Sequence, residues 1–322
     1  WYEAHIKSEE GLNIMGGLFP ASPTIGVGFN PNVAWAATVN KPDLVDVYLL
    51  DMDPNDDMKY RVDGEWMTLA KKDVPITVKL FGFLRWTFKR EALRSIHGPV
   101  LRTDHGVYAV RYAGAGEMRQ VEQWLAMSKS RSLEEWRDAM RLHRFASFNF
   151  VAADSSGNIM FVHNSMTPKR SPGFDWKQYL PGNRQDLIWT SYLAFDMLPQ
   201  LYNPASGFVH SANQSPFKVT AEPHNPDQSQ FRSEDGFPVR MTNRADRGLE
   251  LLKNLGPISA KEFNQIKHDK KYAAHSRAGR YIQSVIGLDL SDAQQDRYHD
   301  AQAHLATWDL STDLDNRGAA LG

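Results

Sequence analysis

The strongest constraint on the fold is the way strand-like and helix-like patterns divide this chain of 322 residues. Short apolar runs bounded by turn residues, typical of β-strands, fill much of the first half: residues 43–50, 60–69, 74–80 and 106–112. The clearest hairpin joins residues 148–153 to 159–162 through a polar turn. These patterns predict a molecule whose first half is mainly β-sheet.

Helix signals concentrate further along the chain. Ser132 is followed three residues later by Glu135, and Ser259 by Glu262, which is the spacing of an N-terminal capping box. Ser291 is expected to begin a third helix. Residues 164–206 are predicted to be a long ordered loop region, and residues 207–212 a short strand ending in a turn. Strands followed by helices favour an α+β or layered α/β fold.

The composition excludes several classes of protein. The chain has no cysteine, which rules out disulfides, thiolate metal sites and a cysteine nucleophile. A formal net charge of -1 gives no bulk electrostatic reason to bind nucleic acid or an anionic membrane. No apolar run approaches the ~20 residues of a membrane span. Both ends read as cut, because Trp1 opens without Met and residues 317–322 stop where a new apolar segment begins.

Four groups of short motifs occur in a distinctive order. They are 1–5 with 16–17, 28–30 and 34–40; 96–100; 148–154 with 157–159 and 168–170; and 203–204 with 207–209 and 211–216. In this order and spacing they resemble the β chain of the penicillin, cephalosporin and acyl-homoserine-lactone acylases, over nearly the whole chain. The resemblance implies an α+β fold, the four-layer αββα sandwich of N-terminal-nucleophile hydrolases.

This resemblance also implies an organisation of the chain. Residues 1–48 and 132–258 would form two parts of the core, 49–131 a β-rich insertion, and 259–322 a truncated helical segment. Members of the family cut a precursor into an α and a β chain, and the new N-terminal serine is the nucleophile, with its own amine as base. This sequence begins a short stretch past that serine. We therefore expect an α-chain partner, a periplasmic or secreted location, and no catalysis by the fragment alone.

The resemblance places an oxyanion hole at two positions. One donor would be the backbone N–H of Val39, which follows the Trp35-x-x-Thr38 stretch, and the other would be the side-chain amide of Asn213. Arg244 matches a family arginine that orients Asn213 and keeps the catalytic amine neutral. Arg247 is a close competitor for that assignment. Without the matched context, each of these residues would be read as an ordinary strand, turn or helix-surface residue.

A structural Ca²⁺ and an acyl pocket are the other implied sites. Asp43 and Asp46 match aspartates that bind Ca²⁺ in several members, with further ligands expected from elsewhere, including the α chain. No organic cofactor is implied. The acyl pocket would draw on four residues: Trp1, Gly26, Trp124 and Phe148. Members selective for glutaryl groups carry an arginine at the position of Gly26, so an uncharged, apolar acyl group is expected here.

Three functions follow, in order of preference. The first is an amide hydrolase acting on an N-acyl-homoserine lactone or a similar apolar acyl amide. The second is a β-lactam acylase of the penicillin type. A third, of another class, is a non-catalytic relative that binds acyl compounds or a partner protein. The residue that precedes Trp1 at the nucleophile position would separate enzyme from binding protein. His97 and His163 lack a Ser/His/Asp arrangement and are interpreted as structural.

Overall fold

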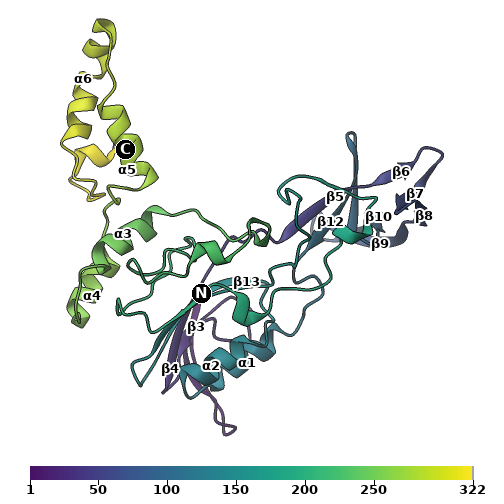
Figure 1. Cartoon of the computed structure of the whole chain (residues 1–322), viewed down its shortest axis with the longest axis horizontal. Helices are drawn as coiled ribbons and strands as arrows, with labels where there is room; N and C mark the ends of the chain where they lie inside the picture. The colour runs from purple at the N-terminus through teal and green to yellow at the C-terminus, as the bar shows by residue number, and fades with distance from the viewer. Residues whose placement is uncertain (321–322) are drawn as a thin grey trace.

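The computed structural model describes residues 1–320, which form two β-sheet regions and a series of helices (Figure 1). None of the described helices is long and apolar enough to cross a membrane. Besides the sheets and α-helices, five short 3₁₀ turns occur in the described residues: Gln185–Leu187, Phe195–Met197, Gln228–Gln230, Ser233–Asp235 and Arg317–Ala320.

An antiparallel seven-stranded sheet forms the first region. Its strands, in spatial order, are β1 (Tyr2–Lys7), β2 (Asn13–Leu18), β3 (Val27–Phe29), β4 (Val33–Thr38), β13 (Ser147–Asp154), β14 (Ile159–Ser165) and β16 (Gln200–Tyr202). Strands β13 and β14 are the predicted hairpin. Gly16 on β2 pairs with Gly28 on β3. A Cβ on Gly16 would lie 2.1 Å from the Val27 carbonyl oxygen, so the close approach of these strands requires glycine.

Two helices cover one face of this sheet: α1 (Gln120–Lys129) and α2 (Leu133–Met140). Ser132 caps α2 by accepting a hydrogen bond from the Glu135 N–H, as the sequence predicts. Trp136 and Phe150 are fully buried in the resulting core and make an edge-to-face contact with centroids 5.8 Å apart. Helix α1 was not foreseen, although it contributes Trp124 and Met127 to the same core.

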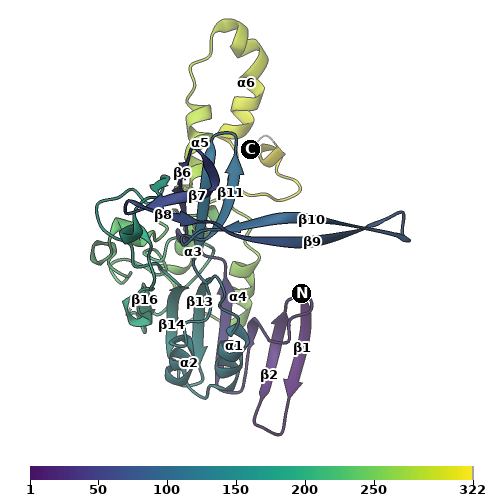
Figure 2. The same cartoon turned by 90° about the vertical axis from the view of Figure 1, so that its right-hand side faces the viewer.

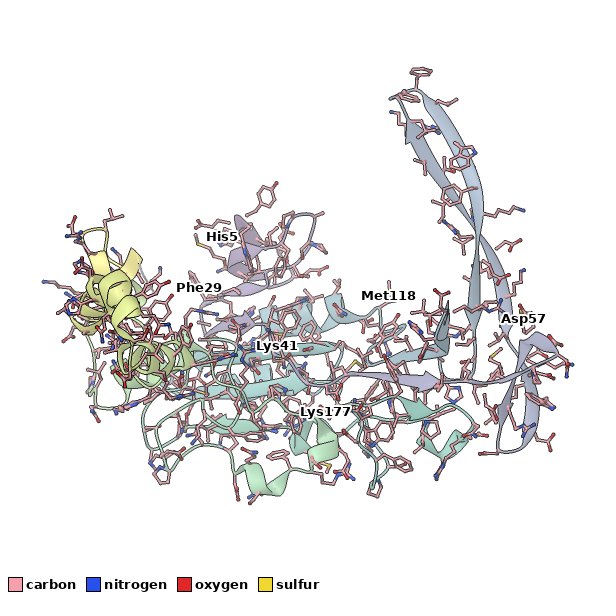
Figure 3. The ribbon with its side chains drawn as sticks, turned by 90° about the horizontal axis from the view of Figure 1, so that it is seen from above. His5, Phe29, Lys41, Asp57, Met118 and Lys177 are labelled. Atoms are coloured by element: carbon pink, nitrogen blue, oxygen red, sulfur yellow. The ribbon has the colours of Figure 1, made fainter. Side chains whose placement is uncertain are left out.

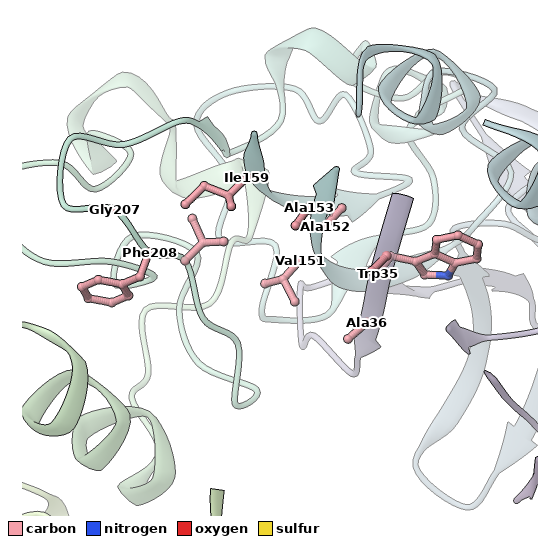
Figure 4. Close-up of a pocket in the computed structure, with 10 residues that line it drawn as sticks. Trp35, Ala36, Val151, Ala152, Ala153, Ile159, Gly207 and Phe208 are labelled. Atoms are coloured by element: carbon pink, nitrogen blue, oxygen red, sulfur yellow. The ribbon is translucent and has the colours of Figure 1, made fainter. Parts of the chain in front are cut away.

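The opposite face of the sheet is open. Small and aliphatic side chains of β4, β13 and β14, among them Ala36, Val151 and Ile159, line an apolar hollow of about 460 Å³ together with Phe208 and Val209 (Figure 4). Trp35 and Ala152 point into the helix-covered core. Because side chains alternate along a strand, their neighbours Ala36 and Val151 point to the opposite face and into the hollow. A sheet with two apolar faces normally packs against other parts of a protein on both faces.

A six-stranded sheet forms the second region. Its order is β15 (Leu180–Pro181), β5 (Val45–Leu49), β12 (Gly106–Tyr112), β11 (Pro99–Thr103), β10 (Leu84–Arg94) and β9 (Ala70–Leu80). A smaller sheet of β6 (Asp51–Asp53), β7 (Asp56–Val62) and β8 (Glu65–Thr68) adjoins it in the chain, and Asp63-Gly64 form its predicted hairpin turn. Strand β5 buries Asp46 and Tyr48, and it exposes the alternate residues Val45 and Leu49.

Four helices follow the sheets: α3 (Asn243–Leu252), α4 (Ala260–Lys267), α5 (Arg277–Ile286) and α6 (Asp292–Ala306). The predicted capping box of Ser259 and Glu262 begins α4, and Ser291 precedes α6. Helix α5 lies within the segment 259–322 that is predicted to be helical, although no start signal was assigned to it. The prediction of a strand at residues 207–212 is wrong, because this segment pairs with no strand and is instead held in a loop by single contacts such as His210 N–H to the Val219 carbonyl.

Candidate active site

Several of the predicted functional residues lie at one end of the seven-stranded sheet. Strand β1 begins there, and β4 ends there, because Tyr2 pairs with Leu18 and the antiparallel strands alternate in direction. Thr38 at the end of β4 pairs with Asn149 on β13. Continuing this register by one residue sets Phe148 opposite Val39. A predicted oxyanion-hole residue and a predicted acyl-pocket residue are therefore cross-strand neighbours.

A tightly held turn brings Asn213 to the end of β4. The Ser211 hydroxyl lies 2.7 Å from that of Thr38, which joins the turn to the strand. Thr242, the N-cap residue of α3, donates its hydroxyl to the Ala212 carbonyl over 2.8 Å. Asn213 has φ +67°, a left-handed conformation that asparagine tolerates better than most residues. Strand, turn and helix thus fix one another at this point.

The amide group of Asn213 has a defined orientation. Its Nδ2 donates to the Val39 carbonyl oxygen over 2.7 Å, and its Oδ1 accepts from Arg244 Nη2 over 2.6 Å. Because the acceptor end faces the guanidinium, the NH₂ end faces Val39. An asparagine NH₂ has two N–H groups, and the contact with Val39 uses one. The second N–H is available to donate to a ligand beside Val39.

The contacts of the two arginines distinguish them. Arg244 contacts Asn213 and is exposed. Arg247 instead forms a bidentate pair with Asp269, at 2.8 and 2.9 Å, and a further hydrogen bond to Glu250 at 3.0 Å. These carboxylates raise the pKa of Arg247 further. Arg247 therefore links α3 to the segment around Asp269. Arg244 is the arginine that contacts the candidate site, through Asn213.

The four predicted acyl-pocket residues form two aromatic clusters. Trp1 stacks on Phe19, with ring centroids 4.4 Å apart. A Cβ on Gly26 would lie 3.7 Å from the same Phe19 ring. Trp124 meets Phe148 edge-to-face at 6.3 Å and belongs to the core under α1. Sequence reasoning missed Phe19, because a single phenylalanine before a proline carries no pattern. Gly26 supplies no cation to this cluster.

Asp43 and Asp46 meet a guanidinium. Arg170, whose side chain is fully buried, donates Nε to Asp46 Oδ2 over 3.1 Å and Nη2 to the Asp43 carbonyl over 3.0 Å. Its Nη2 also lies 3.0 Å from Asp46 Oδ1, an ion-pair distance without hydrogen-bond geometry. Trp189 Nε1 donates to Asp46 Oδ2 over 2.6 Å. Burial raises the pKa of Asp46, and Arg170 opposes that rise.

In this chain both aspartates are already paired with Arg170. The two carboxylates already share one buried cation, and a second cation beside Arg170 would be repelled. The described residues contain no group of three His, Cys, Asp or Glu side chains that could hold a metal. Calcium binding therefore stays a prediction that depends on ligands from elsewhere. The partner seen for these aspartates is 124 residues away from Asp46 in the chain, so spacing could not reveal it.

Two histidines are buried near the sheets. His163 on β14 lies 2.7 Å, through Nδ1, from Asn149 Oδ1, and burial lowers its pKa to about 3. His97 packs against Tyr48 at 4.7 Å, and burial, followed by the charge of Arg111, lowers its pKa to about 4. Both imidazoles are neutral at pH 7. Neither imidazole ring is hydrogen-bonded to a serine in the described residues, which agrees with a structural role.

Comparison with known proteins decides the family. A family model described as penicillin amidase matches residues 1–322, the whole chain. The chain belongs to the penicillin amidase family. The acyl-homoserine lactone acylase PvdQ of Pseudomonas syringae pv. syringae is 26% identical over 346 residues. The penicillin G acylase of Escherichia coli is 29% identical over 215 residues, which cover 65% of this chain and 24% of that protein.

A solved structure supports the fold. The thermostable penicillin G acylase from Alcaligenes faecalis matches 98% of this chain and 54% of its own, with a TM-score of 0.75 and 23% sequence identity. The predicted penicillin-amidase fold class is therefore confirmed. The chain also spans only part of its relatives: the match to the Pseudomonas syringae acylase covers 98% of this chain but 44% of that protein. Relatives of the penicillin amidase family thus carry much polypeptide beyond the matched part.

Proposed function

We propose that the complete protein is an acylase that hydrolyses the amide bond of an N-acyl compound. The observation that carries this proposal is the convergence of Val39, Asn213 and Arg244, which come from three distant segments. Membership of the penicillin amidase family and likeness to two kinds of acylase support it. By the same resemblance, the protein would be processed into an α and a β chain and would act in the periplasm or outside the cell.

The chemistry would begin at an N-terminal serine upstream of Trp1. Its hydroxyl oxygen attacks the carbonyl carbon of the substrate, and its proton passes to the α-amine. Negative charge then develops on the carbonyl oxygen. The Val39 N–H and the second N–H of Asn213 would donate to that oxygen, and Arg244 would hold the amide in the donating orientation. Collapse breaks the C–N bond, the amine leaves with the proton, and water releases the acid from the ester.

The preferred substrate is an amide with an uncharged acyl chain, such as an N-acyl-homoserine lactone. The acyl side of the candidate site would be lined by Phe148 and by the ring pair Trp1 and Phe19, with no side chain at Gly26. Such a lining favours an apolar chain over a carboxylate-bearing one. Comparing kcat/KM for octanoyl and glutaryl amides of one chromogenic amine tests this, and a clear glutaryl preference would contradict it.

A β-lactam acylase is the second candidate. It is favoured by the 29% identity to penicillin G acylase, higher than the 26% to the homoserine lactone acylase, although over fewer residues. The arylacetyl group of penicillin G is also apolar and uncharged, so Gly26 does not separate the two. Hydrolysis of penicillin G and of an acyl-homoserine lactone by the same preparation would rank them.

The replacement Asn213→Ala, made in the complete, processed protein, tests the proposal. If Asn213 donates to the oxyanion, kcat should fall by about 10²–10³-fold with a smaller change in KM, because the bond matters mainly in the transition state. The fold should lose only about 1 kcal/mol, as for one lost hydrogen bond. Two chains on a denaturing gel confirm processing first. Near-normal kcat in the processed variant would refute the assignment of Asn213 to the oxyanion hole.

A further inference from the structure

Strands β9 and β10 form a two-stranded ribbon that projects from the body of the protein (Figures 2 and 3). All eleven residues of β9 pair with β10. Only Leu93 and Arg94, at the base, also pair with the neighbouring strand β11. Residues 84–92 therefore have no strand on their other side. A two-stranded ribbon without further packing is marginally stable in water.

The ribbon has one apolar and one polar face. Residues on the apolar face pair across the strands as Ile76 with Phe88, Val78 with Trp86 and Leu80 with Leu84. Trp86 and Phe88 stack at 5.0 Å. Trp86 is 57% exposed, and the tip residues Phe81 and Phe83 are more than 80% exposed. A continuous exposed apolar surface of this kind normally marks an interface.

The other face is polar and mostly basic. Lys79 pairs with Arg85, Pro75 with Lys89 and Thr77 with Thr87, whose hydroxyls lie 2.7 Å apart. Lys71 and Glu91 form an ion pair on the same face. Charged and polar side chains of this kind are usually exposed to solvent. The charge distribution therefore identifies the apolar face, and not the polar one, as the surface that is covered.

Strand addition at the free edge of β9 is disfavoured. Strand β9 lies at the edge of its sheet. Pro75, in the middle of β9, has no N–H and interrupts any ladder that a further strand could form there. Lys71, Lys72 and Lys79 on the same strand also oppose edge pairing. The free edge of β10 also carries exposed charges, at Arg85 and Lys89. The apolar face is therefore the surface that best accommodates a partner.

We propose that this apolar face is the docking surface for polypeptide of the same precursor outside these 322 residues. The relatives supply the reason: this chain matches 44% of the Pseudomonas syringae acylase and 54% of the Alcaligenes faecalis chain. As much polypeptide again lies beyond the matched part in each. A membrane fits less well, because Lys79, Arg85 and Lys89 would point away from lipid that covered the apolar face. The inference does not depend on the proposed catalytic activity.

Neighbouring residues on opposite faces provide the test. In the complete precursor, Trp86 is replaced by the photo-reactive amino acid benzoylphenylalanine, and in a matched control Arg85 is replaced in the same way. After irradiation, the position-86 variant should form a covalent product with a peptide that lies outside residues 1–322. The product should be lost from the position-85 variant. Peptide mass spectrometry identifies the partner, and an aromatic replacement at position 86 preserves the ribbon.

Other results would overturn the proposal. Mixing ¹⁵N-labelled and unlabelled protein reveals a second copy as the partner, through cross-linked peptides of residues 1–322 that carry mixed isotopes. A phospholipid adduct formed with anionic vesicles would identify a membrane surface. Equal products from both positions, or none from position 86 in protein that elutes as a folded species, would also contradict it. Loss of amidase activity alone would leave the cross-link, and hence this inference, unaffected.

Discussion

The seven-stranded sheet and the β9–β10 ribbon differ in the burial of their large aromatic side chains. In the sheet, helices α1 and α2 cover one face and bury Trp136 and Phe150 completely. In the ribbon, Trp86 and the tip residue Phe83 are exposed to solvent. The difference is geometric, because a ribbon of two strands cannot fold over its own apolar face. One face of the sheet that carries the candidate site is thus packed within this chain, whereas no described residue covers the apolar face of the ribbon.

The largest expected effect concerns the packed side of this comparison. Trp136→Ala in the complete protein should lower the free energy of unfolding by about 3–5 kcal/mol, through lost transfer energy and a cavity. Trp66→Ala is the control, since Trp66 is 42% exposed and stacks only on Arg61; its cost should stay below about 1 kcal/mol. Urea unfolding measures both. Equal costs would mean that the helix-covered face is not the stable core.

The junction between the two regions should respond next. Arg170 joins Asp46 at the start of β5 to the Glu234 carbonyl, 64 residues further along the chain. Arg170→Met would leave a buried carboxylate without its guanidinium and should cost about 3 kcal/mol. Arg184→Met, which breaks the exposed pair with Asp186, should leave the urea midpoint nearly unchanged. If excess Ca²⁺ restored the stability of Arg170→Met, the carboxylates would have a metal-binding role after all.

A smaller effect is expected from pH and should appear in both regions. His163 in the first sheet and His97 in the second are neutral when folded, with pKa values of about 3 and about 4. Unfolded histidine titrates near pH 6.5, so below that pH the unfolded state binds more protons. Lowering the pH from 6 to 5 should therefore lower the free energy of unfolding by about 1 kcal/mol for each histidine.

Replacing one histidine measures its share of the pH effect. In His163→Gln the dependence of the unfolding free energy on pH should become shallower, whatever the absolute stability of the variant. His5→Gln is the control, because His5 is exposed on β1. An unchanged slope in His163→Gln would mean that this imidazole is protonated, or hydrated, in the folded protein.

The structure brings three of the predicted site residues into contact, and their catalytic roles stay predictions. Val39, Asn213 and Arg244 could be named because each sits in a short motif of the resemblance to the acylases, whereas no sequence spacing shows that they touch. Choosing Arg244 over Arg247 needed the structure, since both lie on one helix and only the contact with Asn213 separates them. The loop at residues 207–212 has strand-like composition, and only the absence of a neighbouring strand reveals its conformation. Tertiary context overrides local preference there.

Long-range partners were beyond sequence reasoning for a different physical reason. Arg170 meets Asp43 and Asp46 through a fold that brings residues more than 120 apart into contact, and no local spacing records that. Helix α1 was missed because its first turn lacks a capping side chain. The exposed ribbon was predicted only as a strand, since alternation gives a face but not what covers it.

The most direct test of the central claim is a crystal structure of the complete, processed protein with a tetrahedral acyl-boronate or phosphonate bound to its nucleophile. The proposed mechanism predicts that one oxygen of the adduct lies about 3 Å from both the Val39 backbone nitrogen and Asn213 Nδ2. Arg244 should still donate to Asn213 Oδ1. An adduct whose oxygen points away from Val39, or to other donors while Asn213 contacts only protein, would contradict the assignment of the oxyanion hole.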